Sequence, residues 1–177
     1  GLINYKFFGT KYIIYETKGK GKQFNKYSNS LIFEGEYIKG LRNGKGKEYY
    51  NNGMLMFEGE YLNDKRWNGK GYDCDNNIVY ELKNGKGCIK EYYILGTLKF
   101  EGEYVNGLRN GKGKEYYDEG DLVFEGEYLN NERWNGKGYD YNNNIVYELK
   151  NGKGYVKEYN INCKLIFEGE YLNGLRN

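Results

Sequence analysis

The stretch that decides the fold is Phe33-Glu34-Gly35-Glu36-Tyr37, which the chain repeats letter for letter four more times. These copies begin at Phe57, Phe100, Phe124 and Phe167, and weaker copies begin at Tyr15, Tyr80 and Tyr147. From Phe33 onward, successive starts are 24, 23 and 20 residues apart, and the same three spacings then recur. A block of 67 residues is therefore duplicated, and residues 33–99 match residues 100–166 at 50 of 67 positions. Such a period is typical of arrays in which each unit buries its apolar surface against its neighbours.

Each unit is predicted to be a β-hairpin. Alternation with period two places Phe33, Gly35 and Tyr37 on one face of a strand and the two glutamates on the other. The chain is expected to turn within residues 39–44, and the return strand is expected over residues 45–49, with its lysines opposite the glutamates.

Glycines are expected to make room for aromatic rings. Where Gly35 or Gly46 leaves no side chain, a ring from an adjoining strand can lie on the backbone. The units at Tyr80 and Tyr147 depart from the pattern, because Leu82 and Leu149 replace the strand glycine. We expect turns at residues 84–85 and 151–152, and we expect these hairpins either to be shorter or to bend the array at every third step.

Composition excludes several classes of protein. The 27 basic and 25 acidic side chains alternate at short range, which argues against a nucleic-acid partner. The apolar stretches are too short for a transmembrane helix, and the start carries no secretory signal. Without any His, and with Cys74, Cys88 and Cys163 each replaced in the sister block, neither a metal site nor a disulfide is expected. Three free thiols indicate a reducing compartment, so we predict a cytoplasmic protein.

These residues resemble the MORN (membrane occupation and recognition nexus) repeat. The resemblance rests on Phe-Glu-Gly-Glu-Tyr, then Asn-Gly-x-Arg-Asn-Gly-Lys-Gly, then an aromatic residue, and it is close at residues 33–49, 57–72, 100–116 and 124–139. It covers nearly the whole chain from Tyr15 onward and implies an all-β fold. That fold is an elongated single-layer array of tandem antiparallel β-hairpins, forming a twisted single sheet with a shallow groove.

The expected organisation has three parts. Residues 1–32 form a degenerate N-terminal repeat, and residues 33–166 form six MORN-like hairpins in two blocks of 67 residues. Residues 167–177 are a truncated repeat that continues the array, so we interpret the chain as an excerpt of a longer one. At about 4.8 Å per strand, seven hairpins predict a rod about 65–70 Å long.

The resemblance implies a non-enzymatic scaffold that binds a protein or peptide partner along an aromatic-lined groove, with cytoskeletal or membrane association. Trp and Arg are the commonest interface hot spots, so paired Arg-Trp positions are the best anchors. A structural reading competes with this one, namely that both tryptophans close a turn against the next hairpin. The candidate partner-binding residues are Tyr37, Tyr61, Arg66, Trp67, Tyr104, Tyr128, Arg133 and Trp134.

Other functions remain open at this stage. Recurring lysines (Lys45, Lys47, Lys112 and Lys114) suggest tethering to phosphoinositides or other anionic lipids as an alternative. The chain could also be the accessory array of a larger enzyme, or could form a homo-oligomer through unpaired terminal edges. Within the chain itself we expect no catalytic residues and no cofactor, because its paired carboxylates recur in every unit, whereas an active site needs one special constellation. The Gly-Lys-Gly segments lack the spacing of phosphate loops.

Overall fold

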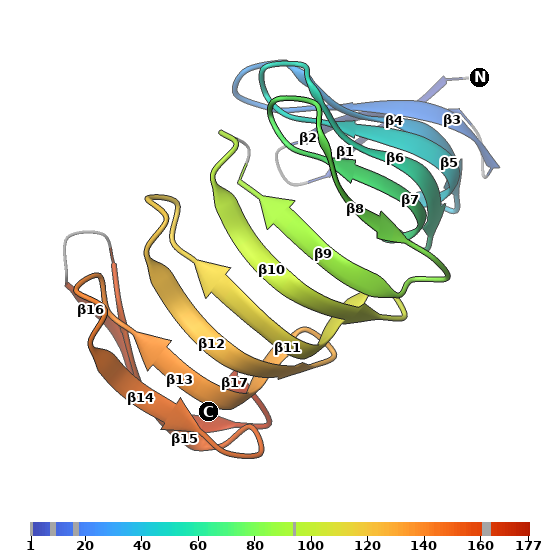
Figure 1. The fold of residues 1–177 in the computed structure, drawn as a ribbon. Helices are drawn as coiled ribbons and strands as arrows, with labels where there is room; N and C mark the ends of the chain where they lie inside the picture. The colour runs from blue at the N-terminus through green and yellow to red at the C-terminus, as the bar shows by residue number, and fades with distance from the viewer. Residues whose placement is uncertain (1, 8–9, 16–17, 94, 161–163) are drawn as a thin grey trace. The chain divides into compact units, whose positions relative to one another are not determined.

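The computed structural model describes residues 2–7, 10–15, 18–93, 95–160 and 164–177, with side chains from Lys18 onward. Throughout these ranges the chain forms β-strands and turns and no helix, which confirms the predicted all-β hairpin array (Figure 1). The strands fall into two compact units, the first holding β1 to β8 and the second β9 to β17.

In the first unit, eight strands form one antiparallel sheet in chain order. Because each strand pairs with the next one along the chain, local hairpin contacts build the whole sheet. Its strands are β1 Leu2–Phe7, β2 Thr10–Tyr15, β3 Lys18–Phe24, β4 Leu31–Ile38, β5 Leu41–Tyr49, β6 Leu55–Leu62, β7 Lys65–Tyr72 and β8 Ile78–Leu82.

The second unit holds two sheets, of six strands (β9 to β14) and of three strands (β15 to β17). The strands are β9 Gly87–Tyr92, β10 Leu98–Val105, β11 Leu108–Tyr116, β12 Leu122–Leu129, β13 Glu132–Tyr139, β14 Ile145–Leu149, β15 Gly154–Tyr159, β16 Leu165–Leu172 and β17 Leu175–Arg176.

The expectation of one uninterrupted sheet was wrong, because the hydrogen-bonded sheets end at the third hairpin of each block. There, Leu82 and Leu149 are buried at the position where other outgoing strands carry glycine. Beyond these leucines, each hairpin carries an isolated bridge between two lysines, Lys83 to Lys86 in one and Lys150 to Lys153 in the other. The strands of these hairpins have five or six residues, so the prediction of shorter hairpins is confirmed.

The predicted turn at residues 39–44 was too long. Only Lys39 and Gly40 form the turn, with φ angles of 51° and 81°, and β5 begins at Leu41. Two consecutive residues with positive φ match the right-handed twist of the flanking strands, so they reverse the chain in two positions. The remaining residues enter the strand through a bulge, where Gly35 pairs with Gly46 but Tyr37 pairs with Arg42.

A row of glycines crosses the middle of each large sheet, and aromatic rings cover it on one face. In the first sheet, Gly21, Gly35, Gly46, Gly59 and Gly69 pair successively from β3 to β7. A Cβ atom built on Gly46 would lie 2.6 Å from Cζ of Phe33, so the ring occupies the space a side chain would need. The expected seating of rings on glycine is therefore observed.

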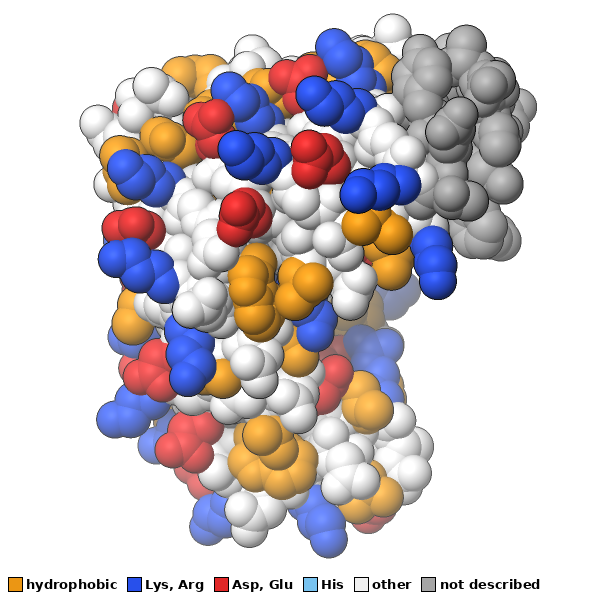
Figure 2. All heavy atoms as spheres, turned by 90° about the vertical axis from the view of Figure 1, so that its right-hand side faces the viewer, with side chains coloured by type: hydrophobic (Ala, Val, Ile, Leu, Met, Phe, Trp, Pro, Cys, Tyr) orange, Lys and Arg blue, Asp and Glu red, His pale blue; other side chains and the backbone are white. Residues whose placement is uncertain are grey.

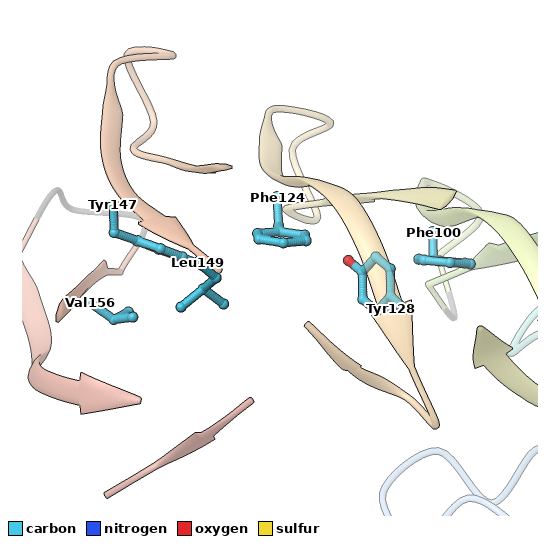
Figure 3. Close-up of a cluster of buried hydrophobic side chains, with 6 residues drawn as sticks. All are labelled: Phe100, Phe124, Tyr128, Tyr147, Leu149 and Val156. Atoms are coloured by element: carbon cyan, nitrogen blue, oxygen red, sulfur yellow. The ribbon is translucent and has the colours of Figure 1, made fainter. Parts of the chain in front are cut away.

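The same packing forms the core of the second unit. Phe100, Phe124 and Tyr128 are almost fully buried, and Leu149 and Val156 continue the cluster toward β15 (Figure 3). The proposed boundaries of the repeats and the expected length of the array stay predictions.

Candidate functional site

The aromatic face of the strands is a packed core. Tyr37, Tyr61 and Tyr128 are only 2–3% exposed. The ring of Phe33 meets those of Tyr37 and Tyr61 edge to face, at centroid distances of 5.5 and 5.1 Å. These rings therefore offer little surface to a partner. They pack against one face of the sheet and make it more rigid.

Behind these rings, Arg and Glu side chains join consecutive hairpins. Arg66 Nε donates to Glu48 over 3.0 Å, and its Nη1 donates to the Tyr80 hydroxyl over 2.7 Å. Its guanidinium also lies over the Phe57 ring, 5.0 Å from the centroid. Such half-buried pairs hold one hairpin against the next, because separating them would leave charges without partners.

The second block repeats this arrangement almost atom for atom. Arg133 Nε donates to Glu115 over 3.0 Å and its Nη1 donates to the Tyr147 hydroxyl over 2.8 Å. Tyr104, which is half-buried, donates its hydroxyl hydrogen bond to Glu91. The predicted tyrosines and arginines are thus brought together, but within the internal contacts of the array.

The electrostatics keep these carboxylates ionised. Burial by itself would raise the pKa of Glu48, but Arg66 and Arg42 outweigh it and the pKa is lowered. The pKa of Glu115 is lowered for the same reason, against burial, by Arg133 and Arg109. Burial raises the pKa of the Tyr147 hydroxyl to about 12. None of these groups is poised to exchange protons near neutral pH, so the cluster is suited to support rather than to acid–base chemistry.

Both tryptophans lie in a β-bulge of the return strand and are half-buried. The carbonyl of Trp67 accepts a 2.8 Å hydrogen bond from the backbone N–H of Gly85, and that of Trp134 accepts an equal one from Gly152. A Cβ atom on Gly152 would lie 2.6 Å from Cζ3 of Trp134, so that indole covers the turn. These contacts favour the reading in which the tryptophans close a turn against the next hairpin.

The opposite face of the first sheet carries an open groove of about 810 Å³ over β3 to β6. Each strand contributes a glycine flanked by two like charges, so Lys-Gly-Lys alternates with Glu-Gly-Glu from strand to strand along the groove. The glycine backbones form its floor and two rows of charged side chains form its walls. Among the described residues that line the groove, Phe24 is the one aromatic residue, and the others are lysines, glutamates and glycines. The lining is therefore mainly charged, whereas the sequence analysis expected an aromatic one.

The two charged rows follow the strand register. One row pairs Lys22 with Glu34 and Lys47 with Glu58, at 3.2 and 3.0 Å between nitrogen and oxygen. The expected pairing of Glu34 with Lys47 is present in the register, although the ion pair of Lys47 is with the next hairpin. On the face shown in Figure 2, basic and acidic side chains are likewise interspersed.

Comparison with known families identifies the repeat. The model of the MORN repeat matches residues 33–55 and 100–122. The chain carries MORN repeats. No curated protein matches the chain. MORN repeats serve as interaction or scaffold modules and are generally not catalytic.

The remaining chemistry of the MORN array is sparse within the described ranges. They contain no group of three or more residues suited to hold a metal ion and no helix able to cross a membrane. Cys74 and Cys88 are free thiols, whereas Cys163 lies outside the described residues. Whether any of the eight candidate residues contacts a partner stays a prediction.

A smaller hollow of about 270 Å³ lies within the second unit of the MORN array and is aromatic in part. Of the eight candidate residues predicted from the sequence, Arg133 lines this hollow. That guanidinium is already bonded to Glu115 and Tyr147, which leaves it little capacity for a ligand.

The sequence analysis missed the glutamates that pair with the arginines between consecutive hairpins, although their spacing could have revealed them. Each Glu of a Lys-Glu-Tyr segment precedes its Arg partner by 18 residues: Glu48 and Arg66, Glu91 and Arg109, Glu115 and Arg133, Glu158 and Arg176. Arg42 Nη2 donates to Gln23, which stands at the corresponding place in the degenerate first repeat, while Nη1 donates to Glu48 of its own hairpin. A search for opposite charges recurring at a constant offset would have found this pairing.

Proposed function

We propose that the chain is a non-catalytic MORN scaffold that binds a protein or peptide partner, and that the partner lies in the groove over β3 to β6. The observation that carries the proposal is the groove itself, an open channel with a side-chain-free floor on a sheet made rigid from the other face. Its volume of about 810 Å³ falls in the usual range of ligand sites, about 300–1,000 Å³.

The chemistry of the walls favours a peptide over an apolar ligand. Half-exposed carboxylates and ammonium groups can exchange their present ion pairs for those of a partner, because exposed pairs contribute only about 0–1 kcal/mol each. The aromatic rings then act indirectly, by holding the strands that carry the charged rows. Trp67 and Trp134 are half-buried, and the turn of the next hairpin packs against each of them.

An anionic membrane is less well supported. Recognition of such surfaces typically needs about four to eight clustered basic residues, whereas every lysine strand in the groove is flanked by a glutamate strand. Cytoplasmic location and association with a cytoskeleton or a larger enzyme stay expectations.

Selection from a random peptide library tests the proposal, with the sister block as a control. Peptides selected on the full 177-residue chain should bind the variant Glu34→Lys/Glu58→Lys at least about tenfold more weakly, since the change makes one of the two charged rows of the groove uniformly basic. They should keep their affinity for Glu101→Lys/Glu125→Lys, which makes the same change in the second block. Circular dichroism would verify that both variants fold.

Two results would contradict the proposal. The first is selection that yields no binding peptide. The second is a set of peptides that bind both variants as tightly as the unaltered chain.

A further inference from the structure

The groove over β3 to β6 carries acidic groups that are better fixed than its basic ones. Glu34 accepts a 2.7 Å hydrogen bond from the Tyr49 hydroxyl, and Glu36 accepts one of 3.0 Å from the backbone N–H of Lys45. Glu60 accepts a 2.7 Å bond from the Asn68 amide. The hydroxyl of Tyr49 is also the main cause that lowers the pKa of Glu34, so this carboxylate is held in place and ionised.

The lysines are held less firmly. Lys22 and Lys47 reach glutamates only through ion pairs in which both side chains are 36–57% exposed. Among the described residues, no carboxylate lies within 4.0 Å of the ammonium group of Lys20 or Lys45. A four-carbon stem can move aside at little cost, so the glutamates define the preorganised half of the site.

The carboxylates of one row recur on alternate strands, with Glu34 held by its hydrogen bond from Tyr49 and Glu58 by its ion pair with Lys47. Glu34 lies on β4 and Glu58 on β6, and Glu81 continues the row on β8, opposite Lys70 of β7. Strands are about 4.8 Å apart, so like charges repeat about every 9.6 Å along the groove. Across the groove, the two rows are separated by two residues of one strand, or about 6.8 Å.

These two lengths discriminate between peptide conformations. An α-helix is about 10–12 Å wide and does not fit between rows about 6.8 Å apart. An extended strand returns to the same face after about 6.8 Å, which does not match the 9.6 Å repeat. A polyproline II helix has three residues per turn and a rise of about 3.1 Å, so it returns after about 9.3 Å.

We propose that the groove over β3 to β6 recognises a proline-rich segment in the polyproline II conformation, with a Lys or Arg at every third position facing the glutamates of β4 and β6. This inference rests on the proposed function, since it names the conformation and charge of the peptide in the same groove. Each basic side chain meets one acidic strand, and the residues between them pass over the lysine strands. Polyproline II segments lose little conformational entropy on binding, which favours a shallow site.

Three synthetic peptides test the inference by calorimetry at low salt against the full chain. The first repeats Lys-Pro-Pro, the second has the same number of lysines at every second position, and the third repeats Glu-Pro-Pro. The first should bind at least about fivefold more tightly than either of the others, as expected when two ion pairs align. Changing Glu34→Gln/Glu58→Gln should remove that advantage, while Glu101→Gln/Glu125→Gln in the sister block should preserve it.

The outcomes separate this inference from the proposed function. Equal affinity of the two lysine peptides would overturn the match of period, and tighter binding of the glutamate peptide would overturn the assigned charge. If none of the three binds while library-selected peptides do, the polyproline II conformation is wrong and groove binding stands. If the library also yields nothing, both proposals fall.

Discussion

Replacing Gly102 by Val is expected to destabilise the second unit by about 3–5 kcal/mol. A Cβ atom at this position would lie 2.6 Å from both Cα of Gly113 and the carbonyl oxygen of Lys112, and 2.8 Å from Cζ of Phe100. Two of these atoms belong to the backbone and cannot move aside without separating β10 from β11. Displacing the fully buried Phe100 ring costs about 1.5–3 kcal/mol, and overpacking adds about 1–3 kcal/mol.

Thermal unfolding followed by circular dichroism or calorimetry measures this effect. In a chain of this size, 1 kcal/mol changes Tm by about 2–4 °C, so Gly102→Val should lower Tm by about 6–20 °C. The matched control is Lys112→Val, one strand away on the exposed face, which should change stability by about 0.5 kcal/mol or less. If Lys112→Val proved as damaging as Gly102→Val, the role assigned to the glycine row would be refuted.

Four further effects are expected. Tyr50→Phe should cost about 1 kcal/mol of unfolding free energy in urea titrations, because it removes the 2.8 Å hydrogen bond to the Tyr72 carbonyl; an unchanged midpoint would exclude that bond as a stabilising contact. Glu115→Gln should cost about 2–3 kcal/mol, because it removes the carboxylate that accepts a 2.8 Å hydrogen bond from Arg133 and leaves Glu158, at 3.7 Å, as the nearby acidic partner. The pKa of Glu115 is lowered in the folded state, so the ionised carboxylate stabilises the fold above about pH 4.5, and this stabilisation is lost as pH falls through the folded pKa. Glu115→Gln should therefore make the free energy of unfolding less dependent on pH in acid. An identical pH profile would contradict the role assigned to this ion pair. Trp134→Ala should lower Tm if the indole mainly closes the turn, whereas a full loss of peptide binding with an unchanged Tm would show it to be a partner anchor. In flotation assays at low salt, vesicles containing anionic lipid should not carry the chain, and robust flotation would favour the membrane alternative.

The repeat period and the alternation of residues were sufficient to predict the hairpins. Phe33 and Tyr37 fall on the same face as Gly35 in any strand with period two, so the prediction that rings lie on glycine needed no tertiary information. The short third hairpin was also predictable, because Leu82 and the Asn84-Gly85 pair stand out against the other units.

The exact turn and the Arg–Glu pairs between hairpins could be predicted less well from the sequence. The glycines and asparagine of residues 39–44 are typical of turns, so the sequence predicts a reversal of the chain anywhere within that stretch. The structure limits the turn to two residues because strand pairing extends the ladder as far as Leu41, and the surplus length enters a bulge. The candidate residues were chosen because Trp, Tyr and Arg are common at interfaces. The kind of residue does not reveal that Arg66 is already paired with Glu48 of the preceding hairpin.

The sequence by itself determined the kind of protein, a β-hairpin array of MORN repeats with a two-sided strand pattern, because periodicity acts through local geometry. Which face is closed and which is open was decided only by the tertiary structure. Phe33 and Tyr61 come from different hairpins, and their rings meet over Gly46 once β4, β5 and β6 pair in register. That packing buries the aromatic face and leaves the glutamates and lysines of the other face as the surface of the groove.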